Sequence, residues 1–175
     1  MNRLTRDCVA ELTSVVRGLA ADRRPLVIAG NDRFFSTGAD LNEIAALNAA
    51  SALEFSRMGR QLTHVIEHFP AEVVAAIAGY CMGGGLDLAL ACHRRIAAPG
   101  AIFGHRGAAL GLITGWGGTQ RLPRVVGRSR TLQMLVAAEK VSAHTALAIG
   151  LIDAVTADPV AAAIRHISTG AATGS

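Results

Sequence analysis

The stretch GYCMGGGLDLALAC, at residues 79–92, places three consecutive glycines between two apolar runs, with an acid, Asp87, just inside the second run. Glycine has no side chain to pack and loses more backbone entropy on folding than any other residue. Its repeated use here indicates a strand that ends at Gly79 and a helix that begins near Gly84. The first N–H groups of a helix have no intrahelical partner, so a ligand oxygen could approach them closely at a glycine. The alternative is tight packing between strand and helix, and the pattern alone leaves both interpretations open.

Short apolar runs and amphipathic segments alternate on both sides of this stretch. Val9, Leu12 and Val16 recur at helical spacing, whereas PLVIAG at 25–30 is a continuous apolar run typical of a buried strand. The patterns predict strands at 25–30, 72–79, 95–98 and 151–155, and helices at 5–20, 51–68, 86–92, 129–138, 142–149 and 159–167. A glycine-rich loop and a short helix broken around Pro123 are expected at 115–126. This alternation predicts an α/β fold with a largely parallel sheet, formed by a single domain at 1–168 and followed by a disordered tail at 169–175.

The composition restricts the classes of partner. The 175 residues are 51% apolar and 4% aromatic and carry a net charge of +4, which fits one globular domain and is compatible with an anionic partner. Too few aromatic side chains are present for base stacking, so nucleic-acid binding is not expected. No apolar run is long enough to span a membrane, and the scattered histidines and cysteines indicate no metal site. The three cysteines lack CxxC spacing, which predicts reduced thiols and a cytoplasmic protein.

A second loop has the same character as the glycine triplet. FFSTGADL, at residues 34–41, also follows a predicted strand, contains a glycine, Gly38, and leads into a helix. Two such loops could supply two convergent N–H donors, which is the geometry that holds a developing oxyanion. Asp40 would lie in the first turn of that helix, where capping is a more common role for a carboxylate than direct chemistry.

Three stretches together resemble the enoyl-CoA hydratase/isomerase (crotonase) family: FFSTGADL, AAIAGYCMGGGLDLALACHRRIAA and FGHRGAALGLITGWGGTQRLPRVVG. The resemblance implies a crotonase-like spiral of ββα turns and a lyase of fatty acid metabolism that stabilises an enolate. It implies an acyl-CoA thioester as the partner, with coenzyme A as part of the substrate and no separate cofactor. It also implies a homo-oligomer, either a trimer or a hexamer.

The resemblance assigns site residues by position. The two oxyanion-hole N–H groups fall on Ala39 and Gly84, and the acid/base carboxylate falls on Asp87. The residues implied to bind the coenzyme A thioester are Ser36, Thr37, Gly38, Ala39, Asp40, Leu41, Gly83 and Gly84. Trp116 falls where the family lines the acyl pocket, and it either closes that pocket to long chains or simply packs.

Two positions depart from the hydratase pattern. Hydratases of the family use two glutamates, whereas here the first position holds the shorter Asp87 and the second holds Gly107, which supplies no acid or base. Displacing a catalytic group by about 1 Å can cost on the order of 100-fold in rate. His105 and Arg106 are the neighbouring candidates for a second proton donor, and we include His105 among the expected catalytic residues. Naphthoate synthases with glycine at this position use bound bicarbonate, which suggests a captured anion as another hypothesis.

The resemblance is incomplete at both ends, because family members have a hairpin before the first helix and further helices after the LIDAV segment. We therefore expect a chain that is truncated at both ends relative to typical members, or a degenerate member. The expected activity is hydration of a 2-enoyl-CoA. The alternatives are a single-carboxylate reaction of the same family (isomerisation, decarboxylation or thioester hydrolysis) and a non-catalytic acyl-CoA binder or assembly subunit.

Overall fold

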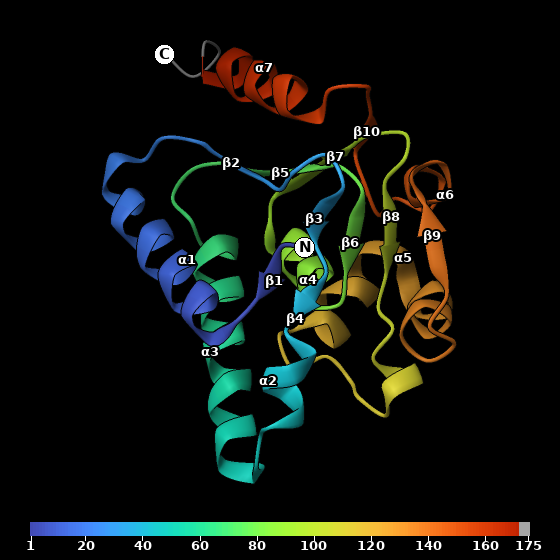
Figure 1. The fold of residues 1–175 in the computed structure, drawn as a ribbon. Helices are drawn as coiled ribbons and strands as arrows, with labels where there is room; N and C mark the ends of the chain where they lie inside the picture. Colours follow the sequence, from blue (N-terminus) through green and yellow to red (C-terminus); the bar gives the residue numbers. More distant parts are fainter. Residues whose placement is uncertain (172–175) are drawn as a thin grey trace.

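The computed structural model describes residues 1–171 as strands and helices that alternate along the chain (Figure 1). The elements are β1 (Arg3–Leu4), α1 (Arg6–Leu19), η1 (Ala20–Asp22), β2 (Leu26–Ala29), β3 (Phe34–Ser36), β4 (Gly38–Ala39), α2 (Leu41–Ala45), α3 (Ala49–Glu67), β5 (Val73–Ile77), β6 (Tyr80–Met82), α4 (Gly84–Ala91), β7 (Arg94–Ala97), β8 (Ile102–Gly104), η2 (Ala108–Leu110), α5 (Gly118–Leu135), β9 (Lys140–Ser142), α6 (Ala143–Ala148), β10 (Ala154–Val155) and α7 (Pro159–Ala171).

Pairs of strands followed by a helix repeat along the chain and build two four-stranded sheets, and β1 and β4 pair in a separate two-stranded sheet. The first strands of three pairs, β2, β5 and β7, lie with β10 in a sheet ordered β10-β7-β5-β2, and the second strands, β3, β6 and β8, lie with β9 in a sheet ordered β3-β6-β8-β9. Neighbouring strands are parallel except β8 and β9, which are antiparallel. Parallel neighbours require crossover connections, and α3 and α4 lie in two of them. The result is a spiral of ββα turns, which confirms the α/β fold expected from the sequence.

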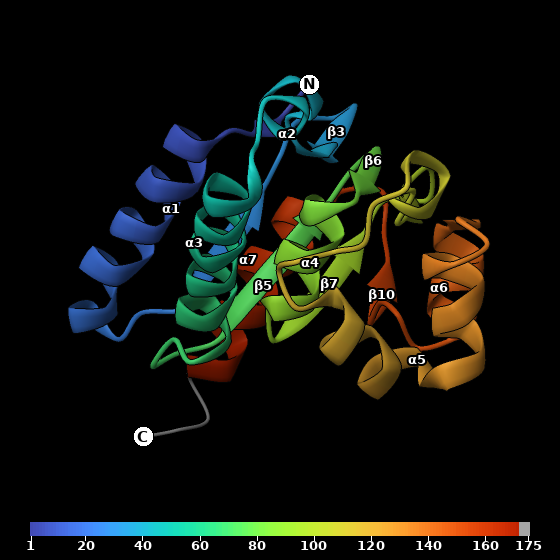
Figure 2. The same cartoon turned by 90° about the horizontal axis from the view of Figure 1, so that it is seen from below.

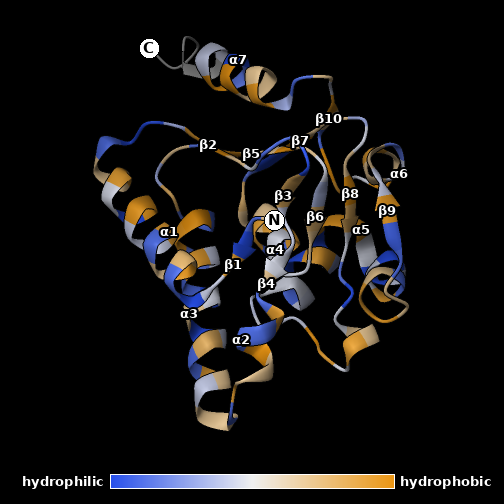
Figure 3. Cartoon of the chain, in the orientation of Figure 1, coloured by the Kyte–Doolittle hydropathy of each residue, from blue (hydrophilic) through white to orange (hydrophobic). Residues whose placement is uncertain are grey.

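Helices cover the two faces of the first sheet. α3 and α4 lie beneath β5 and β7, with α1 packed against α3, whereas α7 crosses the opposite face and contacts β2, β5 and β7 (Figures 1 and 2). Thr5 caps α1 by accepting a hydrogen bond from the N–H of Cys8 at 3.2 Å, and Val9 and Val16 are buried against the core. In Figure 3 the apolar residues of α1 and α3 alternate with polar ones, as expected for half-buried helices.

α4 differs from the other helices because it is buried on every side. All residues from Gly85 to Ala91 are buried, and the helix contacts α3, α5, β3, β4 and β6. Such a helix is normally apolar all round, yet this one carries Asp87 at its centre. A buried carboxylate lowers stability unless polar groups hydrogen-bond to it. Asp87 is therefore a candidate functional residue within the core.

Several boundaries differ from the sequence prediction. The strand predicted at 72–79 ends at Ile77, and a separate strand, β6, follows before the helix. Pro123 does not break α5, whose single non-helical residue is Gly127, with φ +77°. A proline removes one helical hydrogen bond, but the positive φ of Gly127 turns the chain out of the helical path, so the glycine makes the kink.

The C-terminal segment differs in part from the prediction. α7 continues to Ala171, so the first three residues of the expected tail are helical, and residues 172–175 lie outside the part that the structure describes. Within residues 1–171, no helix combines the length and apolar character needed to cross a membrane. Cys8, Cys81 and Cys92 are free thiols in this structure.

Candidate active site

A cavity of about 560 Å³ lies where the 37–47 segment, the N-terminus of α4 and the 105–116 segment meet. The residues predicted for the site that line this cavity are Thr37, Ala39, Leu41, Gly83, Gly84, Asp87 and His105. Ser36, Gly38 and Asp40 lie outside the lining, and their contacts show that they hold the loop in place. Among residues 1–171, no three His, Cys, Asp or Glu side chains are grouped so that they could bind a metal ion.

The loop of FFSTGADL is fixed by hydrogen bonds to the N-terminal segment. The Ser36 hydroxyl donates to the carbonyl of Asn2 at 2.8 Å and accepts from the N–H of Gly38 at 3.1 Å. Asp40 caps α2 by accepting from the N–H of Asn42 at 2.8 Å, and Arg3 donates to the same carboxylate at 2.9 Å. The hydrogen bond from Arg3 is the main reason that the pKa of Asp40 lies below its ordinary value. Asp40 is therefore a cap, which is the role that its position in the sequence favoured.

The loop and the glycine triplet approach each other so closely that only glycine fits. A Cβ placed on Gly38 would lie 2.7 Å from the backbone nitrogen of Gly84, and a Cβ placed on Gly84 would lie 3.4 Å from the backbone nitrogen of Ala39. Gly38 and Gly83 also have positive φ values of +86° and +54°. Gly84 is the first residue of α4, where N–H groups have no intrahelical partner and the helix dipole favours negative charge. The two nitrogens predicted to form an oxyanion hole thus lie side by side in the cavity wall.

Asp87 lies one helical turn after Gly84, with only 1% of its surface exposed. The Thr114 hydroxyl donates a hydrogen bond to Oδ2 of Asp87, and Nε2 of His105 lies 3.6 Å from the same oxygen. Oδ1 of Asp87 has no hydrogen-bond partner within the described part of the chain. That oxygen lies where Gly118 would carry a Cβ, so a side chain at position 118 would collide with it. Thr114 therefore fixes one carboxylate oxygen, and the other is buried without a hydrogen-bond partner among the described residues.

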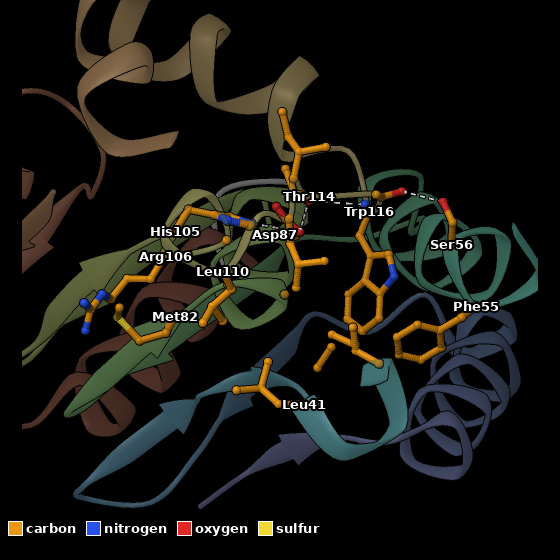
Figure 4. Close-up of a pocket in the computed structure, with 18 of the residues that line it drawn as sticks. Leu41, Phe55, Ser56, Met82, Asp87, His105, Arg106, Leu110, Thr114 and Trp116 are labelled. Atoms are coloured by element: carbon orange, nitrogen blue, oxygen red, sulfur yellow. Dashed lines mark hydrogen bonds and ion pairs between the residues drawn. The ribbon is translucent and has the colours of Figure 1, made fainter. Parts of the chain in front are cut away.

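His105, which the sequence offered as a candidate proton donor, lies beside Asp87, and Gly107 lies close by in a tight turn. His105 is 7% exposed, and its Nε2 has no hydrogen-bond partner among the residues described. The carbonyl of Gly107 accepts hydrogen bonds from the N–H groups of Leu110 and Leu112 at 2.8 and 2.9 Å. Arg106 is exposed and lines the cavity near Met82 (Figure 4). The histidine is thus the group next to the carboxylate, whereas Gly107 contributes backbone only.

Sequence reasoning did not identify Thr114, or Phe55 as the partner of Trp116 in the aromatic wall of the cavity. Trp116 lines the cavity together with Phe55 of α3, and the two rings meet edge to face at 5.3 Å between centroids (Figure 4). Trp116 was expected in the acyl pocket. Its partner Phe55 lies on α3, far away in the sequence, and no local sequence pattern around Phe55 predicts a place in the pocket. Thr114 lies in ITGWGG, where a threonine beside glycines reads as an ordinary turn residue.

Comparisons with known proteins agree on one family. The family model described as enoyl-CoA hydratase/isomerase matches residues 1–169. A probable enoyl-CoA hydratase of Bacillus subtilis is 44% identical over 155 residues, covering 86% of this chain and 60% of the relative. A crotonyl-CoA hydratase of Syntrophomonas wolfei is 39% identical over 158 residues, covering 89% of this chain and 61% of the relative. The crystal structure of an enoyl-CoA hydratase from Bacillus anthracis superimposes with a TM-score of 0.93 at 33% identity, covering 98% of this chain and 69% of that structure.

The chain therefore spans about three fifths of the length of the curated relatives that it matches. The matched part contains the two glycine loops, Asp87, His105 and the aromatic wall, and hence the whole cavity described above.

Proposed function

The chain belongs to the enoyl-CoA hydratase/isomerase family, and from this premise we propose that it adds water across the double bond of a 2-enoyl-CoA. The observation that supports this proposal is the position of Asp87. Among the described residues that line the cavity, Asp87 carries the only carboxylate, and it lies one turn from Gly84. A buried carboxylate and the neighbouring backbone nitrogens of Ala39 and Gly84 at one apolar cavity support a reaction that passes through an enolate.

In the proposed reaction the thioester oxygen lies between the N–H groups of Ala39 and Gly84. A water molecule held by Oδ1 of Asp87 forms a bond from its oxygen to C3 of the substrate. The electrons of the double bond move to the thioester oxygen, and the proton of the water passes to Asp87. Collapse of the enolate then takes a proton at C2, which Asp87 can return, so the carboxylate ends the cycle as it began. One carboxylate thus suffices for the proton balance.

His105 is the proposed second member of the acid/base pair. Its Nε2 lies 3.6 Å from Oδ2 of Asp87 and has no partner among the described residues, so it can hold the same water or receive its proton. A captured bicarbonate is the competing proposal for this role. Both proposals concern the group that replaces the glutamate expected at position 107.

The test is the loss of the enoyl thioester absorbance when the purified chain is mixed with crotonyl-CoA, with Asp87→Asn measured beside it. We expect turnover by the native chain and a loss of at least about 100-fold in the variant, since it removes the general base. Folding of the variant is checked by its thermal transition. No turnover by a folded native chain that still binds an acyl-CoA would reject hydration and favour a non-catalytic acyl-CoA binder.

A single-carboxylate reaction is the second candidate, and the glycine at position 107 favours it. An enoyl-CoA isomerase removes a proton from C2 of a 3-enoyl thioester and returns one to C4. Asp87 alone could accept the first proton and donate the second. Incubation with a 3-enoyl-CoA and chromatography of the products separates the two candidates, because isomerisation yields the 2-enoyl thioester without a hydroxyl group.

Two properties of the whole protein also remain proposals. We propose self-association as a trimer or hexamer, as the family resemblance implies, and a cytoplasmic location, as the spacing of the cysteines predicts. Light scattering of the purified protein measures the first, and fractionation of cells measures the second.

A further inference from the structure

The cavity has one open end and one closed end. Leu41, Leu110 and Ile113 form part of its rim and are 56%, 57% and 73% exposed. Phe55 and Trp116 form its far wall, and each is only 5% exposed. A coenzyme A thioester has a large polar nucleotide that cannot enter an apolar dead end, so it must remain at the open end. The acyl chain of a bound substrate therefore points toward Phe55 and Trp116.

Trp116 occupies a slot that two glycines create. Its indole fills the space where Gly59, inside α3, would carry a Cβ. On its other side, a Cβ placed on Gly84 would lie 2.6 Å from the ring. A glycine inside a helix costs stability relative to alanine, so Gly59 has a packing reason to be there. The ring is thus seated on α3 and touches the N-terminal residue of α4, where we place an oxyanion donor.

Backbone contacts on both sides hold Trp116 in this position. Its N–H donates to the Thr114 hydroxyl at 3.3 Å. Its carbonyl accepts from the Thr63 hydroxyl and from Nη1 of Arg121, each at 3.1 Å. Arg121 is in turn bound to Glu67 of α3 at 2.6 Å. These bonds fix the backbone of Trp116 against α3 and α5, and the indole ring is held by its packing against Phe55 and over Gly59.

We propose that Trp116, seated on Gly59, is the end wall of the acyl pocket and restricts the substrate to short-chain enoyl thioesters. The inference rests on the proposed function for its substrate class, but it concerns the shape of the pocket rather than the chemistry. Each methylene that a pocket cannot accept changes discrimination by roughly 10- to 200-fold, so a ring that closes the pocket is a strong selector of chain length.

The experiment measures kcat/KM for 2-enoyl-CoAs of increasing chain length in native protein, Trp116→Leu and Gly59→Ala. In parallel, calorimetry measures the binding of saturated butyryl-CoA and decanoyl-CoA, which cannot be hydrated. We expect the native protein to prefer the four-carbon substrate over the ten-carbon substrate by at least about 10-fold. Trp116→Leu should reduce that preference at least about 10-fold, and Gly59→Ala should sharpen it, because the new methyl group pushes the ring into the cavity.

Phe69→Leu is the matched control, because Phe69 is a buried aromatic residue that does not line the cavity. It should lower stability while leaving the chain-length ratio unchanged, and Trp116→Phe should keep most of the native preference. Equal binding of the two saturated thioesters by the native protein would overturn the inference and leave the proposed function standing. Selective binding of butyryl-CoA without turnover of any enoyl-CoA would overturn the proposed function and leave the inference on the pocket standing. A variant at Trp116 that leaves the ratio unchanged would also overturn the inference.

Discussion

The Thr114 hydroxyl donates a hydrogen bond to the buried carboxylate of Asp87, although the two residues are 27 positions apart in the chain. The same hydroxyl accepts from the N–H of Trp116, so its proton is directed at Asp87 and not at the backbone. Because Thr114 holds Oδ2, the other carboxylate oxygen has no partner among the described residues, and it is the oxygen to which we assign the water molecule in the proposed function. Thr114 thus orients the carboxylate without having to touch the reacting atoms.

This relationship predicts a specific defect in Thr114→Val. Valine keeps the shape of the side chain but leaves the carboxylate unanchored, so we expect kcat for crotonyl-CoA to fall by about 10- to 100-fold with little change in KM. Thr114→Ser restores the donor and should recover most of the loss. Steady-state kinetics of the three proteins test the prediction, and equal kcat values for the valine and serine variants would contradict it.

His105→Gln separates the two proposals for the second proton carrier. Glutamine has a similar length but cannot carry a proton, so we expect kcat to fall by about 100-fold or more if His105 takes part in proton transfer. Bicarbonate should not restore the rate. If added bicarbonate instead stimulates the native protein, and the variant retains that stimulation, the captured anion is the better explanation.

Gly107→Glu should not create a more active hydratase. A Cβ on Gly107 would lie 2.8 Å from the carbonyl oxygen of Leu112, so any side chain must displace the turn. We expect a lower midpoint of thermal unfolding and no gain in crotonyl-CoA turnover, with Gly107→Ala showing the steric effect alone. A rise in turnover for the glutamate variant would show that the turn adjusts and that only the missing carboxylate limits the rate.

The sequence predicted the long elements better than the short ones. α1 and α3 were correctly predicted because 14 and 19 residues are enough for a helical period to show. β3, β6 and β8 have three residues each, too few for an alternating pattern, and their hydrogen bonds go to strands far away in the chain. The missed strands matter for the site, because β6 leads directly into Gly83 and the N-terminus of α4.

The sequence predicted the site residues that are unusual in their local pattern, which are glycines beside apolar runs and an acid within one. Gly38, Gly84 and Asp87 break the local rules of packing, and the structure brings them together. Thr114 breaks no rule that one sequence can reveal, and Gly59 breaks a helix preference without showing which side chain needs the space. Their meaning depends on Asp87 and on Trp116, which are distant in the chain, so it becomes visible only in the fold.

The thiols should differ sharply in reactivity. Burial raises the pKa of Cys92 to about 12 and that of Cys81 well above its ordinary value, whereas burial and the neighbouring Glu11 raise the pKa of the half-buried Cys8. The thiolate is the reactive form. At pH 8 we expect a thiol reagent to modify only Cys8 in the native protein, and all three cysteines in denaturant. Cys8→Ser is the control, and rapid loss of Cys81 or Cys92 from the native protein would contradict the packing of α4.

Acid should destabilise the loop that contains Ala39, because it protonates Asp40. The hydrogen bond from Arg3, followed by that from the N–H of Asn42, places the pKa of Asp40 below its unfolded value of about 3.9. The native state therefore binds fewer protons at this group than the unfolded state. Its stabilising effect is complete above the unfolded pKa and is lost as the pH falls through the folded pKa.

We therefore expect the free energy of unfolding in urea to fall less steeply below about pH 4 for Asp40→Asn than for the native protein, because the variant has no charge to lose. Asparagine can still cap α2, so the two proteins should converge at low pH. Arg3→Gln removes the main cause of the lowered pKa while keeping the carboxylate, and its acid limb should lie between the other two. Parallel curves for all three proteins from pH 7 to about pH 3 would show that Arg3 and Asp40 contribute nothing to holding the loop.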